Sequence, residues 1–236
     1  MRELLISEIT RMGQGFCVIG LERTASGFSS VRPVPWGGGA WIQFPYGRAD
    51  KLTYDFDPMP VTSPHLEDLR AAHPLKVGAV TEMELVQSLK QAEIADSITA
   101  LFGCHANQSP LGGDAVCITP TDAKRSVCGC SVCSISFSFK YYPPKIRVAL
   151  TMGSGDRLDS LPVVDRDWLK FTELLKDQNR NRLEIFFNSF VVKQLMSSPI
   201  RFARIGLARP DERDLCWPML DSLFPLPKIE WSKEFK

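Results

Sequence analysis

The chain has 236 residues, of which 44% are hydrophobic and 23% charged, the composition of an ordinary globular protein. At this length we expect one or two domains whose cores need no disulfides. The 28 lysines and arginines nearly balance the 27 aspartates and glutamates. This balance excludes a protein that binds polyanions over its whole surface, so any contact with nucleic acid must come from a local patch.

The sequence predicts no membrane partner, because it contains no run of about 18 apolar residues. Its N-terminus, MRELLISEIT, carries Glu3 and Glu8 and lacks the basic and then apolar pattern of a signal peptide. Seven cysteines in such a chain favour free thiols in a reducing compartment. We therefore expect a cytoplasmic protein.

The N-terminal part contains three short apolar runs between residues 3 and 34, separated by glycine-containing turns, which predicts an antiparallel β meander. Proline cannot donate to a central ladder, so Arg32-Pro33 is expected to end the third strand and turn Arg32 toward solvent. Trp36 follows, beside a glycine triplet that lacks the lysine and hydroxyl residue of a phosphate-binding loop. We expect Trp36 to anchor the core or a loop, with base stacking as the alternative.

A possible reactive group follows at His65, Glu67 and Asp68, which bring an imidazole and two carboxylates within four residues. Such a group can bind a divalent metal or perform acid–base chemistry. The competing interpretation is the start of a helix or turn after Pro64, where acidic residues are favoured. We prefer this second interpretation and keep the three residues as catalytic candidates.

Residues 81–102 have helical periodicity. Thr81 and Glu84 are spaced as a capping box, Gly103 is a typical end signal, and a break is expected within 91–96. Beyond this helix, Cys128, Cys130 and Cys133 are thiols of the type that binds zinc. Their spacing does not form two Cys-x-x-Cys knuckles, so we expect free thiols, with zinc as the alternative cofactor.

In the C-terminal half, 133–141 and 145–151 alternate between polar and apolar residues and predict a half-buried β-hairpin. A short helix is expected from Asp165 to about Lys176. The apolar run Leu183–Met196 is interpreted as β-like, with strands following at 200–208 and within 215–224.

The residues between Gln178 and Pro210 are rich in arginine and phenylalanine, with Glu184 as the one acid. A groove for a single strand has this composition, and strands with arginines facing water have it too. The motif Ile-Gly-Leu occurs around Gly20 and again around Gly206, each time followed by an Arg-Pro. We interpret each glycine as a strand kink or a close approach.

The blocks GFCVIGLE and VRPVP near the N-terminus, Pro64–Asp68, Val164–Trp168, and RIGLARP followed by CW and FP resemble bacterial dual OB-domain proteins associated with nucleic-acid modification. The resemblance implies a mainly β protein with two OB-like barrels and a helical connector. The expected boundaries are 1–75, 76–126 and 127–228, with a tail at 229–236.

The resemblance and the basic residues together predict a protein that binds single-stranded DNA or RNA, within a modification or defence system. The alternatives are a metal-dependent or acid–base enzyme acting on nucleic acid, and a subunit that binds a protein partner. The residues expected to contact nucleic acid are Arg11, Arg32, Trp36, Arg201, Arg204, Arg209 and Trp217.

Overall fold

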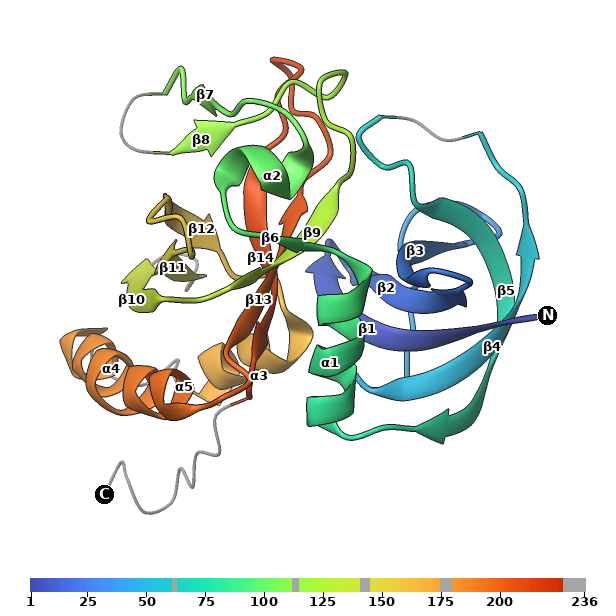
Figure 1. Ribbon diagram of the computed structural model, residues 1–236, viewed down its shortest axis with the longest axis horizontal. Helices are drawn as coiled ribbons and strands as arrows, with labels where there is room; N and C mark the ends of the chain where they lie inside the picture. Colours follow the sequence, from blue (N-terminus) through green and yellow to red (C-terminus); the bar gives the residue numbers. More distant parts are fainter. Residues whose placement is uncertain (61–62, 112–114, 141–144, 175–179, 227–236) are drawn as a thin grey trace.

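The computed structural model describes residues 1–60, 63–111, 115–140, 145–174 and 180–226 (Figure 1). A closed barrel of five strands occupies one side of the molecule, and a second unit of several sheets and helices occupies the other (Figure 1). The predicted fold class, mainly β with a barrel, is confirmed.

The barrel contains the first five strands in the order β1-β2-β3-β5-β4. The parallel pairing of β3 with β5 and the antiparallel pairing of β1 with β4 close it. Alternate apolar side chains such as Leu4, Ile6 and Val18 fill its interior. The strands are β1 (Arg2–Met12), β2 (Gly15–Thr24), β3 (Gly27–Pro35), β4 (Asp50–Asp57) and β5 (Asp68–Ala79).

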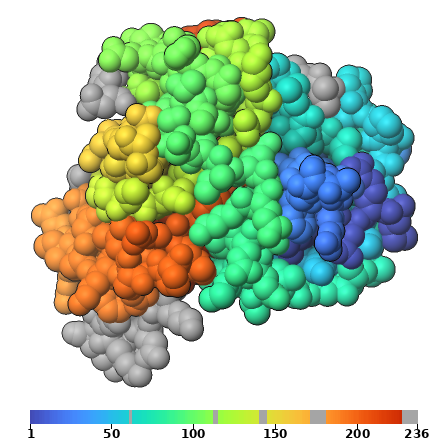
Figure 2. All heavy atoms as spheres, in the orientation of Figure 1, coloured from blue at the N-terminus to red at the C-terminus, as the bar shows by residue number. Residues whose placement is uncertain are grey.

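The connector contains α1 (Glu82–Ala92), β6 (Ile94–Ala95) and α2 (Ile98–Phe102). The capping box is present, because Glu84 N donates to Thr81 Oγ1 at 3.2 Å and Thr81 N donates to Glu84 Oε2 at 2.8 Å. The break predicted within 91–96 is where β6 joins the sheet of the second unit. The connector lies at the surface between the two units (Figure 2).

The described strands of the second unit form three sheets. The largest has the order β14-β13-β9-β6, the next β10-β11-β12, and the smallest β7-β8. The predicted hairpin is confirmed, with Phe137 opposite Val148. The strands are β7 (Asn107–Gln108), β8 (Val116–Cys117), β9 (Val127–Ser131), β10 (Ser134–Lys140), β11 (Lys145–Thr151), β12 (Arg157–Pro162), β13 (Phe202–Leu207) and β14 (Pro218–Phe224).

The β interpretation of Leu183–Met196 is wrong. This segment is helical, as α4 (Arg180–Phe186), the π-helical segment η1 (Phe187–Val191) and α5 (Val192–Ser197). Its buried side chains are Leu183, Phe187, Val191 and Leu195. They recur every four residues, which places them on one face of a helix.

The same helical segment explains why the second unit differs from the expected second barrel. Asn188 in η1 donates to the carbonyl of Phe137 at 2.9 Å and accepts from the Phe137 N–H at 2.8 Å. Glu184 accepts from the N–H of Phe139 at 3.1 Å. Helix side chains thus form hydrogen bonds with the free backbone groups at the edge of β10. The described strands of this unit therefore form open sheets rather than a closed barrel.

Asp165 joins the two units at the start of α3 (Arg166–Leu174), the helix expected there. Its Oδ1 accepts from the backbone N–H of Asp167 at 2.8 Å, which caps the helix. Its Oδ2 accepts from Arg48 of the barrel at 3.2 Å and from Ser222 of β14 at 3.1 Å. The last expected residue of this helix, Lys176, and the tail at 229–236 lie outside the described residues.

The barrel continues to Ala79, beyond the boundary expected at residue 75. Part of the expected connector also belongs with the second unit, because β6 pairs with β9 and Ile118 pairs with Cys216. No helix in the described ranges has the length and apolar character needed to cross a membrane.

Candidate functional site: a cleft between the barrel and the second unit

A cleft of about 250 Å³ lies between the barrel and the second unit. The barrel contributes Arg11, Arg32 and His65 to its lining, and the second unit contributes Arg209 and Asp221. Its apolar walls include Met12, Ile19, Leu207 and Met219. The cleft therefore combines three cations, further polar groups and an apolar surface.

Arg32 lies in the wall of the cleft and is 8% exposed, so the expectation that it turns toward solvent is wrong. Strand β3 does not end at Pro33, because it continues to Pro35 through its parallel pairing with β5. In this register Arg32 lies opposite Asp68, and its Nε donates to Asp68 Oδ1. Arg209 is half-exposed and its Nη2 lies 3.8 Å from the other Asp68 oxygen.

His65 is buried beside these arginines and is 2% exposed. Neither ring nitrogen has a hydrogen-bond partner among the described residues. Burial, reinforced by the charges of Arg32 and Arg209, lowers the pKa of His65 to about 3. The imidazole is therefore neutral at physiological pH, and its pKa is too low for an efficient general base at that pH.

Asp221 lies on β14 and is 5% exposed. Its Oδ1 has no partner within the described part of the chain. Burial, followed by the nearby charge of Glu8, raises the pKa of Asp221 well above its ordinary range. Gly206 makes room for this carboxyl, because a Cβ at that position would collide with both Asp221 oxygens. The second Ile-Gly-Leu motif is thus a close approach, as the sequence indicated.

Arg204, another predicted contact for nucleic acid, is fully buried. Its Nε donates to Glu8 of β1 at 2.5 Å, and its Nη2 donates to Ser30 at 2.8 Å. Glu8 also accepts from Ser7 at 2.5 Å. This ion pair connects β13 to the barrel and removes Arg204 from any surface that a strand could reach.

Of the catalytic candidates, His65 lines the cleft without a hydrogen-bond partner among the described residues, whereas Glu67 and Asp68 are paired with other side chains. Glu67 accepts from Ser126 of the second unit, and burial raises its pKa. Asp68 is paired with Arg32. Within the described ranges, no three His, Cys, Asp or Glu side chains are grouped so that they could hold a metal ion. The metal-dependent interpretation of these residues therefore has no geometric support.

The cysteines do not form a shared site in the described structure. Cys128 and Cys130 are buried in β9, whereas Cys133 is exposed. Cys17 lies in the lining of the cleft, where burial raises the pKa of its thiol to about 11. A nucleophilic thiol needs a lowered pKa. Cys17 therefore contributes to the lining of the cleft and is not a candidate nucleophile.

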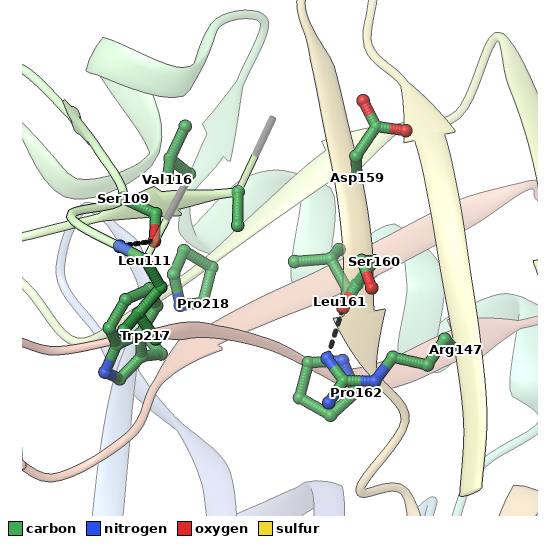
Figure 3. A pocket seen from close by; sticks show the side chains of 11 residues that line it. Ser109, Leu111, Val116, Arg147, Asp159, Ser160, Leu161, Pro162, Trp217 and Pro218 are labelled. Carbon is green, nitrogen blue, oxygen red and sulfur yellow. Dashed lines mark hydrogen bonds between the residues drawn. The ribbon is translucent and has the colours of Figure 1, made fainter. Parts of the chain in front are cut away.

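The remaining predicted contacts lie elsewhere. Arg201 is exposed before β13, at the end of that strand opposite to Arg209. Trp36 is 57% exposed, and the Arg70 guanidinium lies 5.4 Å from its ring centroid. Trp217 lines a separate pocket of about 330 Å³ in the second unit, across from Arg147 (Figure 3).

Two charged residues of this region were not among the predicted site residues. Glu8 and Asp221 are each the one acid in a run of mostly apolar residues, LLISEI and PMLDSLF. A lone acid at a position that should face the core is a recognisable signal, because buried charges need partners or a function.

A scan against protein-family models, a search of curated proteins and a search of solved structures found no match to this chain. The cleft must therefore be interpreted from its own geometry and chemistry.

Proposed function

We propose that the protein binds single-stranded nucleic acid, DNA or RNA, across the cleft between the barrel and the second unit. One observation carries the proposal: Arg11, Arg32 and Arg209 come from distant parts of the sequence and line the same cleft. In a chain whose net charge is only +1, the two exposed arginines, Arg11 and Arg209, place accessible positive charge at the cleft, while Arg32 is paired with Asp68. Positively charged grooves with apolar or aromatic surfaces are typical of proteins that bind single strands.

The barrel supports the same function. Its strand order, with β3 parallel to β5, supports an OB-type assignment, in line with the sequence resemblance to dual OB-domain proteins associated with nucleic-acid modification. OB barrels bind oligonucleotides on strands 2 and 3 and on the loops that connect strands 1–2 and 4–5. The cleft is lined by β1, β2 and β3 and by His65, which lies between β4 and β5.

The proposal is tested by fluorescence anisotropy with labelled single-stranded DNA and RNA over a series of salt concentrations. Arg11 and Arg209 are exposed at the cleft, so replacing both by alanine should preserve the fold. We expect the double variant to bind more weakly. The plot of log affinity against log salt should flatten by about 0.7 for each phosphate that the protein no longer neutralises.

The matched control replaces Arg182 and Lys193 by alanine, since both are exposed on the helices of the second unit and the same amount of charge is removed. This control should retain the affinity and the salt dependence of the wild type. Equal losses in the two double variants would assign binding to general charge rather than to the cleft. Absence of any anisotropy change at low salt would refute the proposed function itself.

A further inference from the structure

Four of the nine buried side-chain polar atoms that lack a partner in the described structure belong to residues that line the cleft. Among the described residues, Arg32 Nη2, both nitrogens of His65 and Asp221 Oδ1 have no hydrogen-bond partner. The three side chains are 8%, 2% and 5% exposed, and all of them line the same cavity. Leaving such atoms unpaired is costly, so a bound group that pairs with them would be stabilised.

The chemistry of these atoms restricts the bound group. The guanidinium of Arg32 only donates, the carboxyl of Asp221 accepts when ionised and can also donate when protonated, and a neutral imidazole does both. A phosphate offers only acceptors and would meet an unfavourable carboxylate when Asp221 is ionised. The edge of a heterocyclic base presents donors and acceptors side by side, so it can pair with all three side chains.

The walls and the size of the cleft agree with a flat heterocycle. Ile19, Leu207 and Met219 provide apolar surface against which a ring can pack. The volume of about 250 Å³ is below the range of about 300–1,000 Å³ that is typical of pockets for larger organic ligands. It suits one ring system rather than a stretch of several nucleotides.

Arg11 and Arg209 place positive charge at the surface end of the cleft, where the phosphate of a bound nucleotide would lie. Both are exposed, whereas Arg32, His65 and Asp221 are buried. Positive charge therefore lies at the surface, where the backbone phosphates of a bound strand would run. Groups that donate and groups that accept hydrogen bonds lie inside the cleft. A base that enters the cleft would leave its phosphates at the surface, beside the two exposed arginines.

We propose that the cleft holds a single nucleobase, turned out of a bound strand, and that Arg32, His65 and Asp221 bind its hydrogen-bonding edge. This inference rests on the proposed function and adds that one base is bound individually. Enzymes and binding proteins that act on single bases hold them in comparable pockets, between apolar side chains and edge-directed polar groups.

The test compares two labelled single strands of equal length, one with normal bases and one in which every base is replaced by an abasic spacer. Binding to the full chain is measured by anisotropy at low salt. We expect the strand with bases to bind about tenfold more tightly, which is the effect of a good hydrogen-bonded base contact. Asp221→Asn keeps the side-chain shape, and it should reduce this preference.

A second measurement does not depend on strands. Nucleoside 5′-monophosphates carrying each of the bases, ribose 5-phosphate and inorganic phosphate are titrated into the protein by calorimetry. We expect at least one nucleotide to bind and the two phosphate controls to bind at least about tenfold more weakly. Met219→Trp, which fills the cleft from its apolar wall, should abolish nucleotide binding even if Asp221→Asn does not fold.

The outcomes separate this inference from the proposed function. Equal binding of the normal and abasic strands would overturn the base pocket, while binding of single strands would stand. Equal binding of nucleotides and ribose 5-phosphate would identify a phosphate site and would also overturn it. If neither strand binds, both proposals fail.

Discussion

The interface between the barrel and the second unit contains several buried charges, and two clusters of them differ in where their unpaired atoms lie. In the first, both Glu8 oxygens accept hydrogen bonds and Arg204 donates to Glu8 and Ser30, which leaves Arg204 Nη1 unpaired but away from any cleft. In the second, His65 has no hydrogen-bond partner among the described residues, and Asp221 leaves one oxygen unpaired. The first cluster is sealed within the protein, whereas the second faces a cleft.

Within one interface, the first cluster therefore has a structural role and the second cluster has the proposed binding role. A buried ion pair with satisfied oxygens connects the units and offers nothing to a ligand. A buried group without a partner costs stability, and a ligand can offset that cost only where the group borders a cleft. We therefore expect changes in the Glu8–Arg204 cluster to alter stability, and changes in the cluster of Arg32, His65 and Asp221 to alter binding.

The largest effect is expected for Arg204→Met, which leaves Glu8 buried without its cation. Breaking one half of a buried pair costs about 3–5 kcal/mol in the free energy of unfolding. Urea denaturation followed by tryptophan fluorescence measures this loss. Arg204 does not line the cleft, so the loss should appear chiefly in stability, with binding changed only through the charge of Arg204 near Asp221.

The control for this variant is the double change Glu8→Leu and Arg204→Met, which removes both charges. It should recover most of the lost stability, because an apolar pair can replace a buried ion pair at little cost. If the single and double variants were equally unstable, packing rather than the unpaired charge would be responsible, and the distinction between the two clusters would be weakened.

A smaller effect is expected for Gly206→Ala, because its Cβ would displace the Asp221 carboxyl. Overpacking of this kind costs about 1–3 kcal/mol, measured by the same denaturation. The matched control is Gly20→Ala in the first Ile-Gly-Leu motif, where the nearest atom would be Leu4 Cβ at 3.0 Å.

Gly20→Ala should lose less stability and keep the affinity for a single strand, whereas Gly206→Ala should weaken binding. A larger loss of stability at Gly20 than at Gly206 would contradict the assignment of Gly206 to the support of Asp221.

The sequence predicts those parts of the fold that depend on neighbouring residues. The hairpin around Phe137 and the capping box at Thr81 follow from local patterns, and both are present. The β interpretation of 183–196 was wrong because aromatic and branched residues outweighed the four-residue spacing of Leu183, Phe187, Val191 and Leu195.

The candidate site was only partly predictable for a related reason. Arg11, Arg32, His65 and Arg209 were recognised by residue type, and the structure brings all four to one cleft. Arg204 differs from these arginines because it forms an ion pair with Glu8, which lies 196 positions away in the sequence. No local pattern contains this contact, so an arginine that binds Glu8 and an arginine that lines the cleft have the same appearance in the sequence.

The smallest effect concerns the pH dependence of stability, and it tests the open cluster directly. Burial raises the pKa of Asp221 above its ordinary value of 3.8. Folded Asp221 therefore keeps its proton at pH values where the unfolded chain has lost it, so its contribution to stability is complete below 3.8 and is lost as the pH rises toward the folded pKa. Asp221→Asn removes this loss.

The free energy of unfolding of Asp221→Asn, relative to wild type, should accordingly increase as the pH rises above about 4. His65→Asn provides a control of opposite sign. Burial lowers the pKa of His65 from 6.5 to about 3, so wild-type stability is lost as the pH falls below 6.5, and this variant should gain relative stability in acid. A pH-independent difference for both variants would mean that neither group is held in an unfavourable state, and the open cluster would then resemble the closed one.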